Sequence, residues 1–127
     1  LQAPVLLGSA ALAPSVIAQS ETATPLTKAE LATYSTMSLL TYCQARSLDV
    51  GFEDSVRIAL AAEVITVFEK HGGEAEGLEK PLDEKQFAAG AEFRLIDRAL
   101  KACPKFIPAE QKSKFEKIVE RIKKNNR

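Results

Sequence analysis

The sequence predicts an all-α fold: a compact bundle of four helices, held by a disulfide between Cys43 and Cys103. Four segments carry apolar residues at helical spacing, and most of them start or stop at residues typical of helix boundaries. The only two cysteines of the chain lie on the apolar faces of the first and third segments. If those faces meet in one core, the two sulfur atoms come within bonding distance. Two buried free thiols are the alternative.

The first helix is predicted to follow Thr27 and to run to about Ser47. Thr27 is a capping residue, and Glu30 lies three positions on, where its carboxylate can reach back to the Thr27 backbone. Leu26 can pack against Leu31 across this helix start. The apolar stripe around Cys43 has the helical period, and it contains Leu31, Tyr34, Leu39, Tyr42 and Ala45.

The second helix, from about Phe52 to Lys70, is the most apolar segment after residue 20. One face holds seven apolar residues, and Ile58, Ala62 and Ile65 occupy much of the other. This distribution predicts a central helix that its neighbours cover on most sides. Gly72 can provide the left-handed conformation that closes the helix.

Two further helices follow an acidic, glycine-bearing loop at 72–81, which is predicted to be mobile. The third helix starts after its cap Asp83 and ends at Cys103, because Pro104 disfavours helical geometry in the residue before it. Pro108 is placed to open the last helix. Its apolar stripe is predicted to cover the core from one side, and it contains Phe115, Ile118, Val119 and Ile122.

The first twenty residues differ from the rest of the chain. Residues 1–20 hold no charged residue, whereas the chain has 17 Lys and Arg and 17 Asp and Glu after them. An apolar stretch ending in small residues predicts the later part of a secretory signal peptide, cleaved after Ala18 or Ser20. Residues 21–127 then form a single helical domain. A transmembrane anchor and a disordered tail are the alternatives for residues 1–20.

Composition limits the compartments in which the protein is expected and the classes of partner that it could bind. A signal peptide would bring the chain to the periplasm, the thylakoid lumen or the extracellular space, where disulfides form. The zero net charge gives no electrostatic argument for nucleic acid, and cleavage would leave no stable membrane anchor. A protein partner remains open, and the sequence does not define the oligomeric state.

No catalytic, cofactor or metal site is predicted. A catalytic zinc needs about three protein ligands, and His71 is the only histidine of the chain. Its nearest carboxylates in sequence are Glu74 and Glu76, on a glycine-flanked loop. His71 is therefore predicted to be a solvated residue at a helix end. The two cysteines have no histidine beside them to activate a thiolate.

Two groups of polar residues are candidate sites. Arg94, Arg98 and Lys101 recur at helical spacing and could dock an acidic partner, although a solvated face is the favoured interpretation. Glu63 lies within the main apolar face of the second helix. Buried, it would need a partner, and an ion pair with Arg46 or Arg57 is favoured over a functional carboxylate.

The segment from Leu26 to Lys124 resembles small exported helical proteins of cyanobacteria. The matching pieces are Tyr34-Ser35-Thr36, Leu39-Leu40, Tyr42-Cys43, Ala89-Gly90-Ala91-Glu92-Phe93 and Cys103-Pro104. Some of these proteins are labelled class II cyclic AMP phosphodiesterases, and the resemblance would imply that activity. That enzyme class uses a His-x-His-x-Asp-His metal signature.

A looser similarity, in layout only, is to the periplasmic acid-stress chaperones of the HdeA type. They are small helical domains with one disulfide between an early and a late helix and a Lys-rich final helix. The functional prediction is therefore an exported helical module that acts by binding, without catalysis. The alternatives are a cyclic-nucleotide phosphodiesterase and an acid-stress chaperone.

Overall fold

The computed structural model describes residues 23–126, so the predicted signal peptide at 1–20 lies outside the described part. The four α-helices are α1 (Lys28–Ser47), α2 (Phe52–Ile65), α3 (Glu84–Ala102) and α4 (Ala109–Asn125). A π-helical turn, η2 (Thr66–Lys70), extends α2, and a 3₁₀ turn, η3 (Pro104–Phe106), follows α3. The predicted all-α fold is confirmed.

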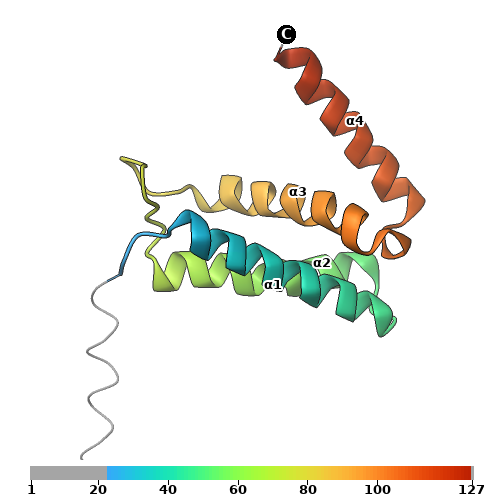
Figure 1. Ribbon diagram of the computed structural model, residues 1–127, viewed down its shortest axis with the longest axis horizontal. Coiled ribbons are helices and arrows are strands. Elements are labelled where there is room, and N and C mark those ends of the chain that lie inside the picture. The colour runs from blue at the N-terminus through green and yellow to red at the C-terminus, as the bar shows by residue number, and fades with distance from the viewer. Residues whose placement is uncertain (1–22, 127) are drawn as a thin grey trace, which may run out of the picture.

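Three helices form the core (Figure 1). α1 and α2 pack as an antiparallel pair, and α3 lies along both of them. One group of buried residues fills the end nearest the disulfide, and it includes Leu39, Tyr42, Val56, Ala59, Leu95 and Ala99. A second group fills the other end, with Leu26, Val67, Phe87 and Ala91. Within residues 23–126, none of the helices combines the length and apolarity that a bilayer crossing demands.

The start of α1 has the predicted capping box. The Thr27 hydroxyl accepts a hydrogen bond from the Glu30 backbone N–H at 3.0 Å, and Glu30 Oε1 accepts one from the Thr27 N–H at 3.1 Å. Two of the donors that a helix start leaves unpaired are thereby satisfied. At the start of α3, the Asp83 carboxylate accepts from the Gln86 N–H at 2.9 Å, as its capping role requires.

The predicted disulfide joins Cys43 of α1 to Cys103 at the end of α3. Their Cα atoms lie 6.2 Å apart, and 60 positions separate them in sequence. Next to this bond, Tyr42 is fully buried and its hydroxyl donates to the Phe106 carbonyl at 2.7 Å. Burial raises the pKa of the Tyr42 hydroxyl, an effect that the nearby Arg46 partly offsets.

The loop after η2 is tied to the segment that precedes α1. Leu26 and Ala75 form an isolated parallel bridge, in which the Leu26 N–H donates to the Glu74 carbonyl at 2.8 Å and the Glu76 N–H donates to the Leu26 carbonyl at 3.0 Å. We call residues 23–27 the N-terminal strap. At Gly73, φ is +74° and an added Cβ would lie 3.0 Å from the Phe68 ring, so this turn requires glycine.

The prediction that the last helix covers the core is wrong. α4 projects steeply away from the other three helices (Figure 1). Its first turns rest on α3, where the rings of Phe93 and Phe115 lie 4.9 Å apart, but Ile118 and Ile122 are exposed. The periodicity of α4 was sufficient to predict a helix. The periodicity does not determine the angle between α3 and α4, which depends on the backbone of the 103–108 link.

The prediction that α2 is covered on most sides is also wrong. Ile58 and Ile65 are more than half exposed, and Ala61 and Ala62 are exposed between them. These four residues face away from α3. They lack a cover because α4 points elsewhere and only three helices make up the core.

Replacing both cysteines, as Cys43→Ala with Cys103→Ala, should lower the free energy of unfolding by about 4 kcal/mol, since the disulfide restricts a long loop in the unfolded chain. Urea unfolding followed by circular dichroism measures this difference. The same loss should appear in the native chain when a reductant is added, and the double variant should then show no further change. A loss below about 1 kcal/mol would contradict the role given to the disulfide.

Candidate functional site

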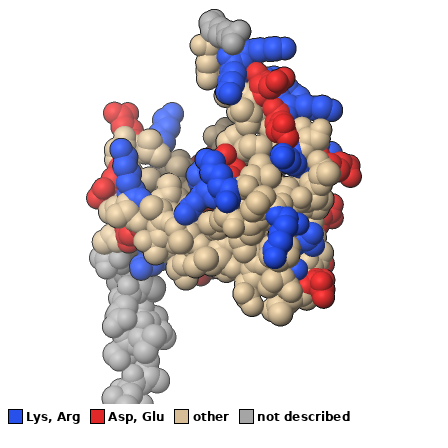
Figure 2. Space-filling view, turned by 45° about the vertical axis from the view of Figure 1, so that its right-hand side comes forward, with Lys and Arg blue, Asp and Glu red and all other residues tan. Residues whose placement is uncertain are grey.

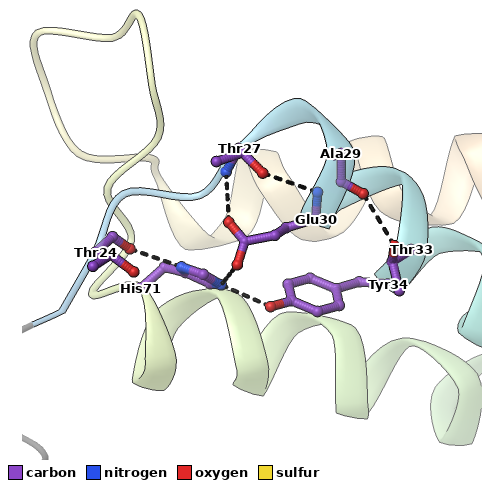
Figure 3. Close-up of polar contacts among 7 residues, drawn as sticks. All are labelled: Thr24, Thr27, Ala29, Glu30, Thr33, Tyr34 and His71. Carbon is purple, nitrogen blue, oxygen red and sulfur yellow. Dashed lines mark hydrogen bonds and ion pairs between the residues drawn. The ribbon is translucent and has the colours of Figure 1, made fainter.

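His71 is buried, which corrects the prediction of a solvated helix-end residue. Its side chain has no exposed surface, and it lies under the N-terminal strap at the end of η2 (Figure 3). His71 Nδ1 lies 2.7 Å from the Thr24 carbonyl oxygen, which can only accept, so Nδ1 carries the proton. In the neutral ring, Nε2 then accepts from the Tyr34 hydroxyl at 2.8 Å. The histidine thus connects the strap to α1.

Glu30 completes this cluster. One of its oxygens caps Thr27, and the other, Oε2, lies 3.7 Å from His71 Nε2. The pKa of Glu30 is lowered, chiefly by the backbone hydrogen bond from Thr27 and next by the Thr27 side chain, while His71 and Lys70 contribute less. Ionised Glu30 therefore supports both the start of α1 and the polar contacts under the strap.

Glu63 is the second buried polar centre, and it joins α2 to two other helices. Only 3% of the residue is exposed. Glu63 Oε1 accepts a hydrogen bond from the Ser35 hydroxyl at 2.9 Å, and Oε2 lies 3.2 Å from the Ser38 hydroxyl. Arg94 Nη2 of α3 lies 4.0 Å from Oε1, at the limit of an ion pair. The two serines are small enough to let α1 approach this carboxylate closely.

The prediction that Glu63 pairs with Arg46 or Arg57 is wrong. Arg57 is exposed and lies 3.6 Å from Asp54 on its own helix. Arg46 donates to the Phe106 carbonyl at 3.0 Å and to the Val50 carbonyl at 3.0 Å, so it fastens the two chain reversals near the disulfide. The cation nearest Glu63 is Arg94. The helical spacing of Arg94, Arg98 and Lys101 predicts instead that Arg94 belongs to a solvated surface stripe.

The three residues of that stripe have different environments. Arg94 stacks over the Phe87 ring, with 5.4 Å from Cζ to the ring centre, and its Nε and Nη2 atoms are buried without a hydrogen-bond partner. Arg98 donates to the Thr36 hydroxyl at 3.0 Å, and Lys101 pairs with Asp97 at 3.5 Å. Arg94 is therefore half-buried between Phe87 and Glu63. Binding of an acidic partner by Arg98 and Lys101 stays a prediction.

A cavity of about 270 Å³ lies between α1 and α2, beside both polar centres. Its walls include Tyr34, Met37, Ser38, Ala59, Ala62 and Glu63. Ligand pockets usually measure roughly 300–1,000 Å³, so this cavity is slightly smaller than that range. Sequence patterns do not predict this cavity, because a cavity depends on how two helices are rotated about their axes.

The described residues contain no set of side chains that could bind a metal ion. Among residues 23–126, no three His, Cys, Asp or Glu side chains come together in a group that could hold a metal ion. His71 has a strap carbonyl and a tyrosine as its hydrogen-bond neighbours, and both ring nitrogens are engaged by them. The cluster is thus arranged as a structural tie between segments.

Comparison with known proteins places the chain in a family. A family model described as a domain of unknown function, DUF8650, matches residues 29–127. The chain belongs to the DUF8650 family. The DUF8650 match covers α1 from its second residue and all of α2, α3 and α4, and it includes both cysteines, Glu63 and His71. No match was found among curated proteins or among solved structures.

Glu30 should make the stability of the fold depend on acid pH. Its folded-state pKa lies below its unfolded value, so its contribution is complete above about pH 4.3 and is lost as the pH falls through the folded pKa. Glu30→Gln should therefore be less stable than the native chain at pH 7, and the difference should shrink as the pH falls below 5.

Urea unfolding between about pH 3 and pH 7 measures this difference. Glu79→Gln is the matched control, because Glu79 is an exposed carboxylate on the loop, and it should leave the pH profile unchanged. A Glu30→Gln profile parallel to that of the native chain at every pH would show that the Thr27 contact does not depend on ionised Glu30.

Proposed function

We propose that this DUF8650 protein is a binding module that engages the apolar face of an amphipathic helix in a partner protein. The contact surface is the outer face of the α1–α2 pair. We define this outer face by its exposed residues, which are Met37, Leu40, Thr41 and Gln44 of α1 and Ile58, Ala61, Ala62 and Ile65 of α2.

The observation that carries the proposal is the absence of charge from this surface. Between Leu31 and Ala45 the chain has no charged residue, and the exposed positions of α2 from Ile58 to Ile65 have none either. Charged residues make up 27% of the chain, and they gather elsewhere. Figure 2 shows a broad uncharged area across the lower middle of the bundle, with charged side chains at its margins.

Four large side chains on the outer face remain open to solvent. The exposed fractions are 60% for Met37, 63% for Leu40, 52% for Ile58 and 54% for Ile65. Burying a fully exposed side chain of this size stabilises a complex by roughly 1.5–3 kcal/mol, so each of these would contribute about 1 kcal/mol. Several exposed apolar side chains on one uncharged surface are typical of interaction sites in soluble proteins.

A helix is the form of partner that suits this surface. Two antiparallel helices leave a shallow groove along their seam, and an amphipathic helix can lay residues spaced three and four apart into such a groove. Because the outer face offers no charge, the affinity would come from apolar contact. Charged residues along the edges of the partner would stay in solvent.

The disulfide supports the proposed location of this binding module. Disulfides persist in oxidising compartments and are rare in the cytosol. Together with the signal peptide predicted from residues 1–20, this bond favours an exported protein. Intact-mass measurement of the protein from its native compartment would test this, because export predicts a cleaved leader and an oxidised cysteine pair.

Single substitutions on the outer face should weaken partner binding. A fluorescent amphipathic peptide of leucine and glutamine with polar edges serves as the probe, and anisotropy measures its affinity. Leu40→Lys and Ile58→Lys should each weaken binding about tenfold or more, because each places a charge in an apolar contact. Circular dichroism should show both variants folded, since both positions are already exposed.

Ile122→Lys is the matched control, since it introduces the same charge at an exposed isoleucine of α4. It should bind the peptide like the native chain. Equal loss in all three variants, or no binding by the native chain, would refute the proposal. Sedimentation of the native chain alone tests the other occupant of this face, a second copy of the protein.

An acid-stress chaperone is the second candidate, and one observation favours it. The strap and the start of α1 depend on ionised Glu30, so acid weakens the contacts that close this end of the bundle. This candidate predicts that a dye specific for apolar surface binds more strongly below about pH 4. Unchanged dye binding down to pH 3 would remove it. The phosphodiesterase alternative rests on the resemblance alone, and an assay of purified protein with cyclic AMP decides it.

A further inference from the structure

The buried carboxylate of Glu63 forms part of the wall of the cavity between α1 and α2. Glu63 and Ser38 both line it, and Ser38 bonds to Glu63 Oε2. Glu63 Oε1 points to Ser35 and Arg94, and neither of these residues lines the cavity. Oε2 is therefore the carboxylate oxygen on the cavity side.

This oxygen is short of donors. The Ser38 hydroxyl lies 3.0 Å from the Ala59 carbonyl and 3.2 Å from Glu63 Oε2, but a hydroxyl has only one proton to donate. A carboxylate oxygen can accept two hydrogen bonds, and a buried charge is costly unless it is paired. Arg94, the nearest cation among the described residues, lies on the opposite edge and at 4.0 Å.

The remaining walls are suited to an apolar body. Met37 and Ala59 border the cavity with carbon surface, and Ala62 lies at its exposed side. The volume of about 270 Å³ admits only a small molecule. An occupant must therefore combine a compact apolar part with a group that donates hydrogen bonds to Oε2.

We infer that this cavity binds a small organic cation, namely a protonated primary amine carried on a short apolar chain. The ammonium group donates hydrogen bonds to Glu63 Oε2 and to the Ser38 hydroxyl oxygen, while the Ser38 hydroxyl keeps its proton and donates to the Ala59 carbonyl. The apolar chain lies against Met37 and Ala62. This inference does not rest on the proposed function.

Lys70 is the one other charged residue that lines the cavity. It is exposed in the last turn of η2, and it lies near enough to Glu30 to assist the Thr27 hydrogen bonds in lowering the pKa of Glu30. Its charge is therefore at the solvent side of the cavity, close to an acidic neighbour, and its aliphatic stem borders the opening.

Calorimetric titration of the whole protein with hexylammonium tests the inference, with hexanoate and hexanol as probes of the same length. Hexylammonium should bind saturably at one site per chain, and the other two probes should bind at least about tenfold more weakly, the cost of losing a hydrogen bond to a charged group. Absence of hexylammonium binding, or equal binding of hexanoate, would overturn it.

Two substitutions locate the site. Ala62→Leu fills the cavity and should abolish binding, whereas Ala61→Leu adds the same side chain at an exposed neighbour outside the cavity and should not. Equal behaviour of these two variants would place the amine elsewhere and refute the site. Glu63→Gln keeps the shape of the carboxylate, removes its charge, and should weaken binding about tenfold or more in the folded variant.

These outcomes are separable from the test of partner binding. Leu40 and Ile58 do not line this cavity, so Leu40→Lys and Ile58→Lys should bind hexylammonium like the native chain. Failure of peptide binding with retained amine binding would refute the proposed function alone. Retained peptide binding without amine binding would refute the cavity alone.

Discussion

The close approach of α1 to α2 is the contact on which the rest of the molecule depends. The Ser38 hydroxyl donates to the Ala59 carbonyl at 3.0 Å, so one short side chain spans the space between the two helices here. The same approach brings Ser35 and Ser38 to the Glu63 carboxylate and buries it. Arg94 of α3, which packs over the Phe87 ring, reaches to 4.0 Å from this carboxylate, so α3 also borders the polar centre. The polar centre thus fixes the rotation of three helices about their axes.

Sequence patterns predicted the features that arise from local chemistry. The Thr27 capping box, the Asp83 cap and the end of α3 before Pro104 each depend on residues within a few positions of one another. The Cys43–Cys103 bond was predictable because the chain offers one possible pair, placed on two apolar faces. Helix existence and helix boundaries followed from such signals.

The features that the sequence did not predict are those that depend on distant segments. His71 is buried because the strap pairs with the loop at Glu74 and Glu76. The sequence has no periodic pattern that predicts a single β-bridge of this kind. Glu63 lies near Arg94 of α3, a helix distant in sequence, whereas Arg57 lies on an exposed face of the helix that carries Glu63. The angle of α4 follows from backbone geometry in the 103–108 link, where each residue permits several directions.

The exposed surface of this small protein has a charged part and an uncharged part. α4 is amphipathic and rich in lysine, and it stands away from the core. The outer face of α1 and α2 is uncharged and carries large side chains in solvent. Charges on such a face would favour solubility, and their absence along four turns of α1 is the reason for proposing a partner there.

The position of the disulfide in the chain has a topological consequence. Cys43 and Cys103 enclose α2, η2, the acidic loop and α3 within one covalent ring, while the strap and α4 lie outside it. A protease that cuts the chain once within this ring leaves both pieces joined as a single molecule. One cut after Cys103 instead releases α4, so the same number of broken peptide bonds has opposite effects on the two sides of that residue.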